Sequence, residues 1–129
     1  MPTIEYLDYS VLTDYGWDLE DDDLFGKAAD AELSTEEYGT FDTYESEAVL
    51  VAAERAGFFW PFSCRGGSCA NCACKVIEGE LTMNEQIALT DEEVEEKNIY
   101  LTCISQAATE HVQLVYNVKQ VPYLQDRVI

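Results

Sequence analysis

The chain has 129 residues, the length of one domain, and 47% of them are hydrophobic, which is enough to bury a core. It carries 26 acidic and 7 basic residues, so its formal net charge is −19. Nucleic acids and anionic membrane surfaces would repel such a chain, and its apolar runs are too short to cross a bilayer. We therefore expect a soluble protein that has neither nucleic acid nor a membrane as a partner.

The acidic side chains are concentrated near the N-terminus. Residues 1–54 contain 16 of them and a single basic residue, Lys27. One interpretation is a docking surface for basic partners, and the other is adaptation to concentrated salt. The two are compatible, and we assign most of the charge in the N-terminal segment to adaptation.

The first predicted elements lie in this acidic part. Alternating residues at 3–7 predict a strand. In the segment from about residue 10 to residue 38 we expect two short helices. The first covers Val11 to Tyr15 and ends at Gly16, and the second opens on the aspartates at 21–23, whose charge suits a helix N-terminus. The apolar stripe of the second helix consists of Leu24, Phe25, Ala28 and Ala29. A disordered acidic tail is the alternative, but the spaced aromatic residues of this segment argue against it.

Capping residues predict the next helices. A helix over residues 46–56 starts with Ser46 as N-cap and ends at Gly57. The T-x-x-E pattern at residues 90–93 is a capping box that opens a short acidic helix ending near Lys97. An S-x-x-E pattern at residues 34–37 predicts a turn of the same kind.

The remaining elements complete an α+β fold. Apolar and β-branched runs predict strands at residues 39–44, 75–77, 99–104 and 112–118. The C-terminal residues 122–128 predict a last helix. Together these elements predict a mixed, curled sheet of four or five strands with a packed helix.

The most specific feature of the chain is a group of four cysteines. Cys64, Cys69 and Cys72 have the spacing C-x4-C-x2-C, and Cys103 follows after a gap of 30 residues. This is the ligand spacing of a plant-type [2Fe–2S] cluster. Three thiolates from one loop require a tightly folded backbone, which the two glycines between the first two cysteines allow. We expect the fourth ligand to come from the strand at residues 99–104.

Other uses of the cysteines fit less well. Structural zinc sites usually have two C-x2-C-like pairs, whereas here three ligands share one loop. Five cysteines are an odd number for a disulfide framework, and the N-terminus does not resemble a secretory signal. The fifth, Cys74, is either a substitute ligand or a small buried hydrophobic residue, and we favour the second. If a strand holds both, Cys74 and Cys72 face the same side of the sheet.

From residue 47 to the end the chain resembles the plant-type [2Fe–2S] ferredoxins, through residues 61–72, 75–76 and 101–103. With its acidic N-terminal segment, the whole chain resembles the ferredoxins of halophilic archaea. The resemblance implies one β-grasp domain over residues 1–129, with an acidic insertion at about residues 10–38.

The resemblance also implies how the cofactor is held. Cys64 and Cys69 would bind one iron of the [2Fe–2S] cluster, and Cys72 and Cys103 would bind the other. The cluster would have a low reduction potential of about −400 mV.

We therefore expect a one-electron carrier and not an enzyme. The resemblance implies electrons from 2-oxoacid:ferredoxin oxidoreductases, which would dock on the acidic surface. We expect a monomer in the cytoplasm, where free thiols persist. The alternatives are an interaction module stabilised by zinc and a cluster-bearing regulatory protein, although the chain has no basic patch that would favour a regulator.

Overall fold

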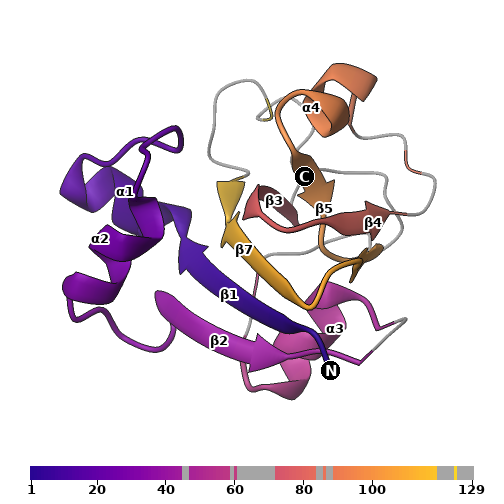
Figure 1. Cartoon of the computed structure of the whole chain (residues 1–129), viewed down its shortest axis with the longest axis horizontal. Coiled ribbons are helices and arrows are strands. Elements are labelled where there is room, and N and C mark those ends of the chain that lie inside the picture. Colours follow the sequence, from indigo (N-terminus) through magenta and orange to yellow (C-terminus); the bar gives the residue numbers. More distant parts are fainter. Residues whose placement is uncertain are drawn as a thin grey trace.

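The computed structural model describes residues 1–44, 47–58, 60, 72–83, 86, 89–118 and 124. Within them, a five-stranded sheet has the order β2-β1-β7-β3-β5 (Figure 1). Its strands are β1 (Thr3–Asp8), β2 (Tyr38–Asp42), β3 (Ala73–Glu78), β5 (Ile99–Leu101) and β7 (His111–Tyr116). Strands β1 and β7 are parallel, and the other neighbouring pairs are antiparallel. The predicted mixed sheet is confirmed.

A second, two-stranded sheet was not predicted. It pairs β4 (Leu81–Met83) with β6 (Ser105–Ala107), and strands this short carry no readable alternation. The predicted strand at 99–104 is correspondingly wrong at its end. It stops at Leu101, whose carbonyl accepts a hydrogen bond from the Ser105 hydroxyl at 2.7 Å, so the chain turns before β6.

The core lies on both faces of the large sheet. Helix α3 (Val49–Arg55) packs against one face, and α1 (Tyr9–Tyr15) and α2 (Leu24–Asp30) pack against the other. Alternation along the strands separates the two side-chain sets. The α3 side includes Ile4, Tyr6, Cys74, Val76, Val112, Leu114 and Tyr116. The opposite side includes Leu7, Ala73, Ile99, Leu101 and Val115.

Helix α3 begins later than its sequence predicted. Ala48 is the N-cap and makes no side-chain capping bond, while Ser46 lies outside the described residues. Instead, the Leu50 N–H, which has no acceptor within the helix, donates to the Thr102 carbonyl at 3.0 Å. The helix ends before Gly57, which has a φ of 97°, as expected of a left-handed C-terminal residue.

Helix α1 ends as predicted but begins earlier. Gly16 closes it with a φ of 72°. Its start at Tyr9 is explained by Asp8, whose carboxylate accepts the Ser10 N–H at 2.9 Å as an N-cap.

Helix α2 confirms most of its predicted stripe. Leu24, Phe25 and Ala28 are buried, but Ala29 is exposed, so its place in the stripe was wrong. Position 29 lies beyond the edge of the narrow face that a two-turn helix can bury. The preceding aspartates cap it less directly than expected. Asp23 makes no side-chain capping bond, and Asp21 pairs with Lys27 at 2.7 Å.

Helix α4 (Asp91–Glu95) has the predicted capping box. The Thr90 hydroxyl accepts the Glu93 N–H at 3.2 Å, and the Glu93 carboxylate accepts the Thr90 N–H at 2.9 Å. The helix ends at Glu95, slightly earlier than predicted. The turn at residues 34–37 is also present, with Glu37 accepting from both the N–H and the hydroxyl of Ser34.

The predicted C-terminal helix over residues 122–128 lies outside the described residues, apart from Leu124, which is buried. In the described part of the chain, no helix is both long enough and apolar enough to cross a membrane.

Candidate iron–sulfur site

Two of the four predicted ligands are described, and the sheet brings them together. Cys72 precedes β3, and Cys103 follows β5. These strands are antiparallel neighbours, with Ala73 opposite Leu101, so their adjoining ends converge. The Sγ atoms of Cys72 and Cys103 lie 3.3 Å apart.

This separation suits two thiolates on one metal ion. A disulfide would bring the sulfur atoms to about 2.05 Å, so the two cysteines are not bonded to each other. Two metal–sulfur bonds of about 2.3 Å at a tetrahedral angle place the sulfur atoms about 3.8 Å apart. A shift of a few tenths of an ångström would therefore allow Cys72 and Cys103 to bind the same iron.

Thr102 fixes the backbone around both ligands. Its N–H and its hydroxyl both donate to the Cys72 carbonyl, at 3.1 and 3.0 Å. Its own carbonyl accepts the Leu50 N–H of α3. Thr102 is buried, so these bonds are not in competition with water. Such outer partners hold metal ligands in place.

The environment of Cys72 disfavours its free thiolate. The hydrogen bond with Cys103 and burial both raise the pKa of the Cys72 thiol. Metal ligation requires the deprotonated form, so a bound cation has to supply the opposing charge. Without a metal the Cys72 thiol stays protonated.

Cys64 and Cys69 lie outside the described residues, as does the rest of the loop at 61–71. The described part of the chain contains no group of three or more metal-binding side chains, because two of the four predicted ligands lie outside it.

Cys74 has the surroundings of a core residue. It is fully buried on the α3 side of the sheet, and burial raises its pKa to about 12. Cys72 packs with the opposite side of the core, so the expectation that the two share a face was wrong. The reason is that Cys72 lies just before β3, where strand alternation does not apply.

Comparison with known proteins gives the same answer as the cysteines. Residues 36–108 match the family described as "2Fe-2S iron-sulfur cluster binding domain". The chain is 54% identical to Ferredoxin-1 of Haloarcula marismortui over 129 residues, which is 100% of both chains. It is 44% identical to Ferredoxin-2 of the same organism over 119 residues, covering 92% of this chain and 86% of the relative.

A solved structure agrees at the level of the fold. The structure described as "Pseudomonas putida CBB5 NdmA with ferredoxin domain of NdmD" aligns with a TM-score of 0.54. The alignment covers 60% of this chain and 88% of that one, and the sequences are 22% identical. The family match and the full-length relatives, together with this β-grasp fold, place the chain in the plant-type [2Fe–2S] ferredoxin family, as an electron-transfer protein with a [2Fe–2S] cluster and not an enzyme.

Proposed function

We propose that Cys64, Cys69, Cys72 and Cys103 are the four cluster ligands, with Cys72 and Cys103 on one iron. The 3.3 Å approach of these two sulfur atoms, at the adjoining ends of paired strands, is the observation that supports the placing of Cys72 and Cys103 on one iron. When bound, the cluster accepts and releases one electron. Thr102 holds the backbone at Cys72 and Cys103, so little needs to move at these two ligands when the charge changes.

Single substitutions test the ligand assignment. Cys72→Ala and Cys103→Ala should each abolish the visible absorption of the purified protein and the release of iron and sulfide on acid treatment. Cys74→Ser is the matched control, and it should retain the visible spectrum although the buried hydroxyl lowers stability by about 1 to 3 kcal/mol. Loss of the cluster in Cys74→Ser together with its retention in Cys103→Ala would show that the assignment is wrong.

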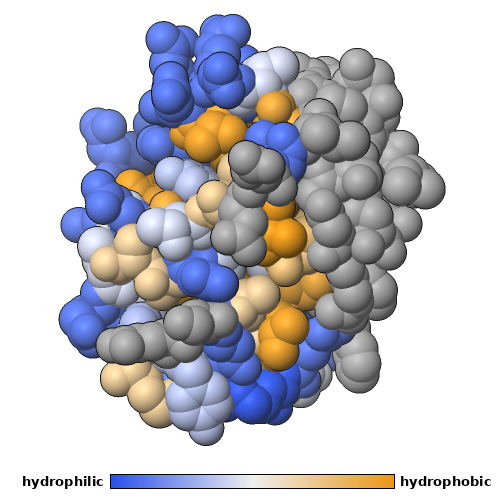
Figure 2. Space-filling view, turned by 90° about the vertical axis from the view of Figure 1, so that its right-hand side faces the viewer, coloured by the Kyte–Doolittle hydropathy of each residue, from blue (hydrophilic) through white to orange (hydrophobic). Residues whose placement is uncertain are grey.

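The electron donor is proposed to be a 2-oxoacid:ferredoxin oxidoreductase that docks on the acidic surface of α4. This helix leads into β5 and so to Cys103. Glu92, Glu95 and Glu96 are exposed, whereas Glu93 is buried in the capping box and so adds little to a docking surface. Figure 2 shows hydrophilic side chains gathered at the top of the molecule, at the height of α4 in Figure 1.

Anaerobic reduction by a purified 2-oxoacid oxidoreductase tests this donor. In concentrated salt, with the 2-oxoacid and coenzyme A, we expect the visible bands of the cluster to bleach by one electron per chain. Omitting the 2-oxoacid is the control. Bleaching by dithionite but not by the oxidoreductase would reject the donor and leave the electron-carrier function intact.

We also propose that the protein is a monomer in the cytoplasm. The net charge of −19 opposes association of identical chains, and the free thiols suit a reducing compartment. Light scattering coupled to gel filtration in molar KCl tests the first point, and a mass near 14.5 kDa is expected.

A further inference from the structure

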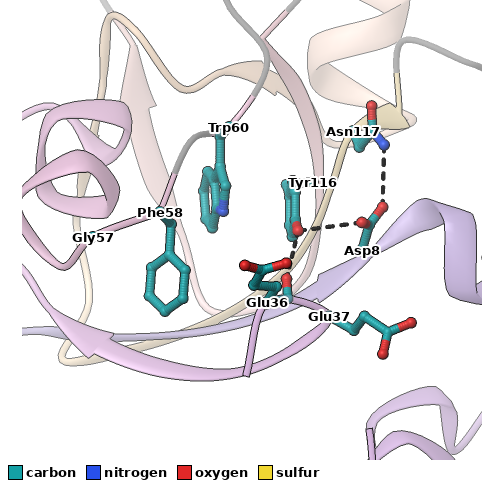
Figure 3. A pocket seen from close by; sticks show the side chains of 8 residues that line it. All are labelled: Asp8, Glu36, Glu37, Gly57, Phe58, Trp60, Tyr116 and Asn117. Carbon is teal, nitrogen blue, oxygen red and sulfur yellow. Dashed lines mark hydrogen bonds between the residues drawn. The ribbon is translucent and has the colours of Figure 1, made fainter. Parts of the chain in front are cut away.

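A pocket of about 430 Å³ is lined by none of the described cysteines. Its walls come from four parts of the chain (Figure 3). The lining residues are Asp8, Glu36, Glu37, Gly57, Phe58, Trp60, Tyr116 and Asn117. The volume lies in the range of sites that hold small ligands or single side chains. The pocket combines acidic and aromatic walls, a combination that suits an organic cation.

The pocket is close to the cluster ligands along the chain. Tyr116 lies opposite Cys74 in the β3–β7 pairing, at about 5 Å between Cα atoms. Cys72 is two residues further along, which adds at most about 7 Å. A partner group in this pocket would therefore be held beside the redox centre.

The aromatic wall is a stacked pair. The rings of Trp60 and Tyr116 are 4.4 Å apart between centroids and inclined by 7°. The Tyr116 hydroxyl donates to the Glu36 carbonyl at 2.6 Å, which fixes the pair against the segment before β2. The two rings cover each other and are buried, so the apolar stem of an incoming side chain would contact their edges and the partly exposed Phe58.

The Trp60 indole nitrogen is a buried donor without a hydrogen-bond partner among the described residues. In Figure 3 it lies on the edge of the ring that is turned toward Glu36. A buried donor without an acceptor is unfavourable by about 1 to 3 kcal/mol. An occupant that brings an acceptor oxygen as well as a cation would therefore suit the pocket better than a metal ion.

Of the three carboxylates, Glu36 is the one left for an occupant. Asp8 already accepts from Ser10 and Asn117, and Glu37 accepts from Ser34. The Glu36 carboxylate is exposed and has no hydrogen-bond or ion-pair partner among the described residues. It is therefore able to bind an incoming guanidinium group.

We propose that this pocket receives an arginine side chain of the redox partner, with its guanidinium on Glu36 and its stem against the aromatic wall. The inference rests on the electron-carrier function and adds a second contact area to α4. An arginine within a protein segment also supplies main-chain carbonyl oxygens, which are acceptors for the Trp60 N–H.

Electron transfer to cytochrome c, a basic one-electron acceptor, tests the pocket. The dithionite-reduced protein passes one electron to the ferric haem, and stopped-flow absorbance gives the second-order rate constant. Glu36→Gln is compared with Asp22→Asn, which removes one exposed charge outside the pocket. We expect Glu36→Gln to lower the rate constant about 3- to 10-fold, and Asp22→Asn less than about 2-fold.

A competition experiment distinguishes binding in the pocket from general screening of charge. N-acetyl-arginine amide should slow transfer by the parent more than KCl does at equal ionic strength, and this excess should vanish in Glu36→Gln. Trp60→Phe, which keeps an aromatic ring but removes the N–H, should show an intermediate rate. The visible spectrum of each variant verifies that the cluster is intact.

Equal rate constants for Glu36→Gln and Asp22→Asn would overturn the pocket proposal while the electron-carrier function stands. Competition that persists in Glu36→Gln would overturn it as well. Failure of the parent, with its cluster intact, to reduce any acceptor would overturn the function and the pocket together.

Discussion

Removing the hydroxyl at position 90 should destabilise the protein more than removing the one at position 34. Both residues begin an S/T-x-x-E pattern, but only Thr90 caps a helix. Thr90→Ala removes the acceptor of the Glu93 N–H at the start of α4. Ser34→Ala removes an exposed hydroxyl that donates to Glu37 at 3.0 Å, and the Ser34 N–H keeps the same carboxylate oxygen.

The magnitudes follow from these geometries. Loss of a Thr N-cap lowers the free energy of unfolding by typically about 1 kcal/mol and at most about 2 kcal/mol. The loss for Thr90→Ala should lie at the upper end of this range, because Glu93 is buried and the capping box supplies a hydrogen bond to its carboxylate. The entropy of unfolding is about 2.1 cal/mol/K per residue. For a chain of 129 residues, a loss of about 1 to 2 kcal/mol in the free energy of unfolding therefore lowers the thermal midpoint by about 4 to 7 °C. An exposed hydroxyl contributes at most about 0.5 kcal/mol, or about 2 °C.

The assay is thermal unfolding of both variants and the parent in molar KCl, followed by far-UV circular dichroism and by cluster absorbance. Thr90→Ser is the matched control, since it keeps the capping oxygen and should lose less than half as much. Equal midpoints for Thr90→Ala and Ser34→Ala would refute the reasoning that a reciprocal cap, and not the sequence pattern, determines stability.

Three further predictions concern charge and backbone. Reversing Glu92 and Glu95 to Lys should slow electron transfer from a basic donor about 5- to 30-fold at the lowest salt that preserves the fold. The reason is that two exposed ion pairs with the donor would be lost, which weakens docking by about 1 to 2 kcal/mol. Unchanged stopped-flow rates would show that α4 is not part of the interface. Molar KCl should raise the thermal midpoint, because salt screens the repulsion within the net charge of −19. The Debye length falls from about 8 Å at 0.15 M to about 3 Å at 1 M. A thermal midpoint that does not change with salt concentration would contradict this. Gly79→Ala should lower the free energy of unfolding in a denaturant titration by about 1 to 3 kcal/mol. Gly79 has a φ of 84°, and a Cβ there would lie 2.3 Å from the His111 carbonyl oxygen. A midpoint equal to that of the parent would contradict this, because it would show that the β3–β4 turn adjusts easily.

The sequence by itself was sufficient for features that depend on neighbouring residues. The cysteine spacing indicated the cofactor, since three ligands lie within nine positions of one loop. Gly16 and Thr90 indicated helix ends correctly because capping involves residues at most four positions apart. The predicted mixed sheet followed from strand patterns of the same local kind.

Only the tertiary structure decided features that depend on distant residues. The start of α3 depends on Thr102, which lies more than fifty positions from Leu50 and takes the place of a local cap. The same threonine orders Cys72 and Cys103, a role that its place in the sequence beside Cys103 did not reveal. The pocket likewise joins Asp8, Glu36, Trp60 and Tyr116, and the parallel pairing of β1 with β7 places Asp8 beside Tyr116. Contacts of this kind depend on the register of the whole sheet, which local preferences do not specify.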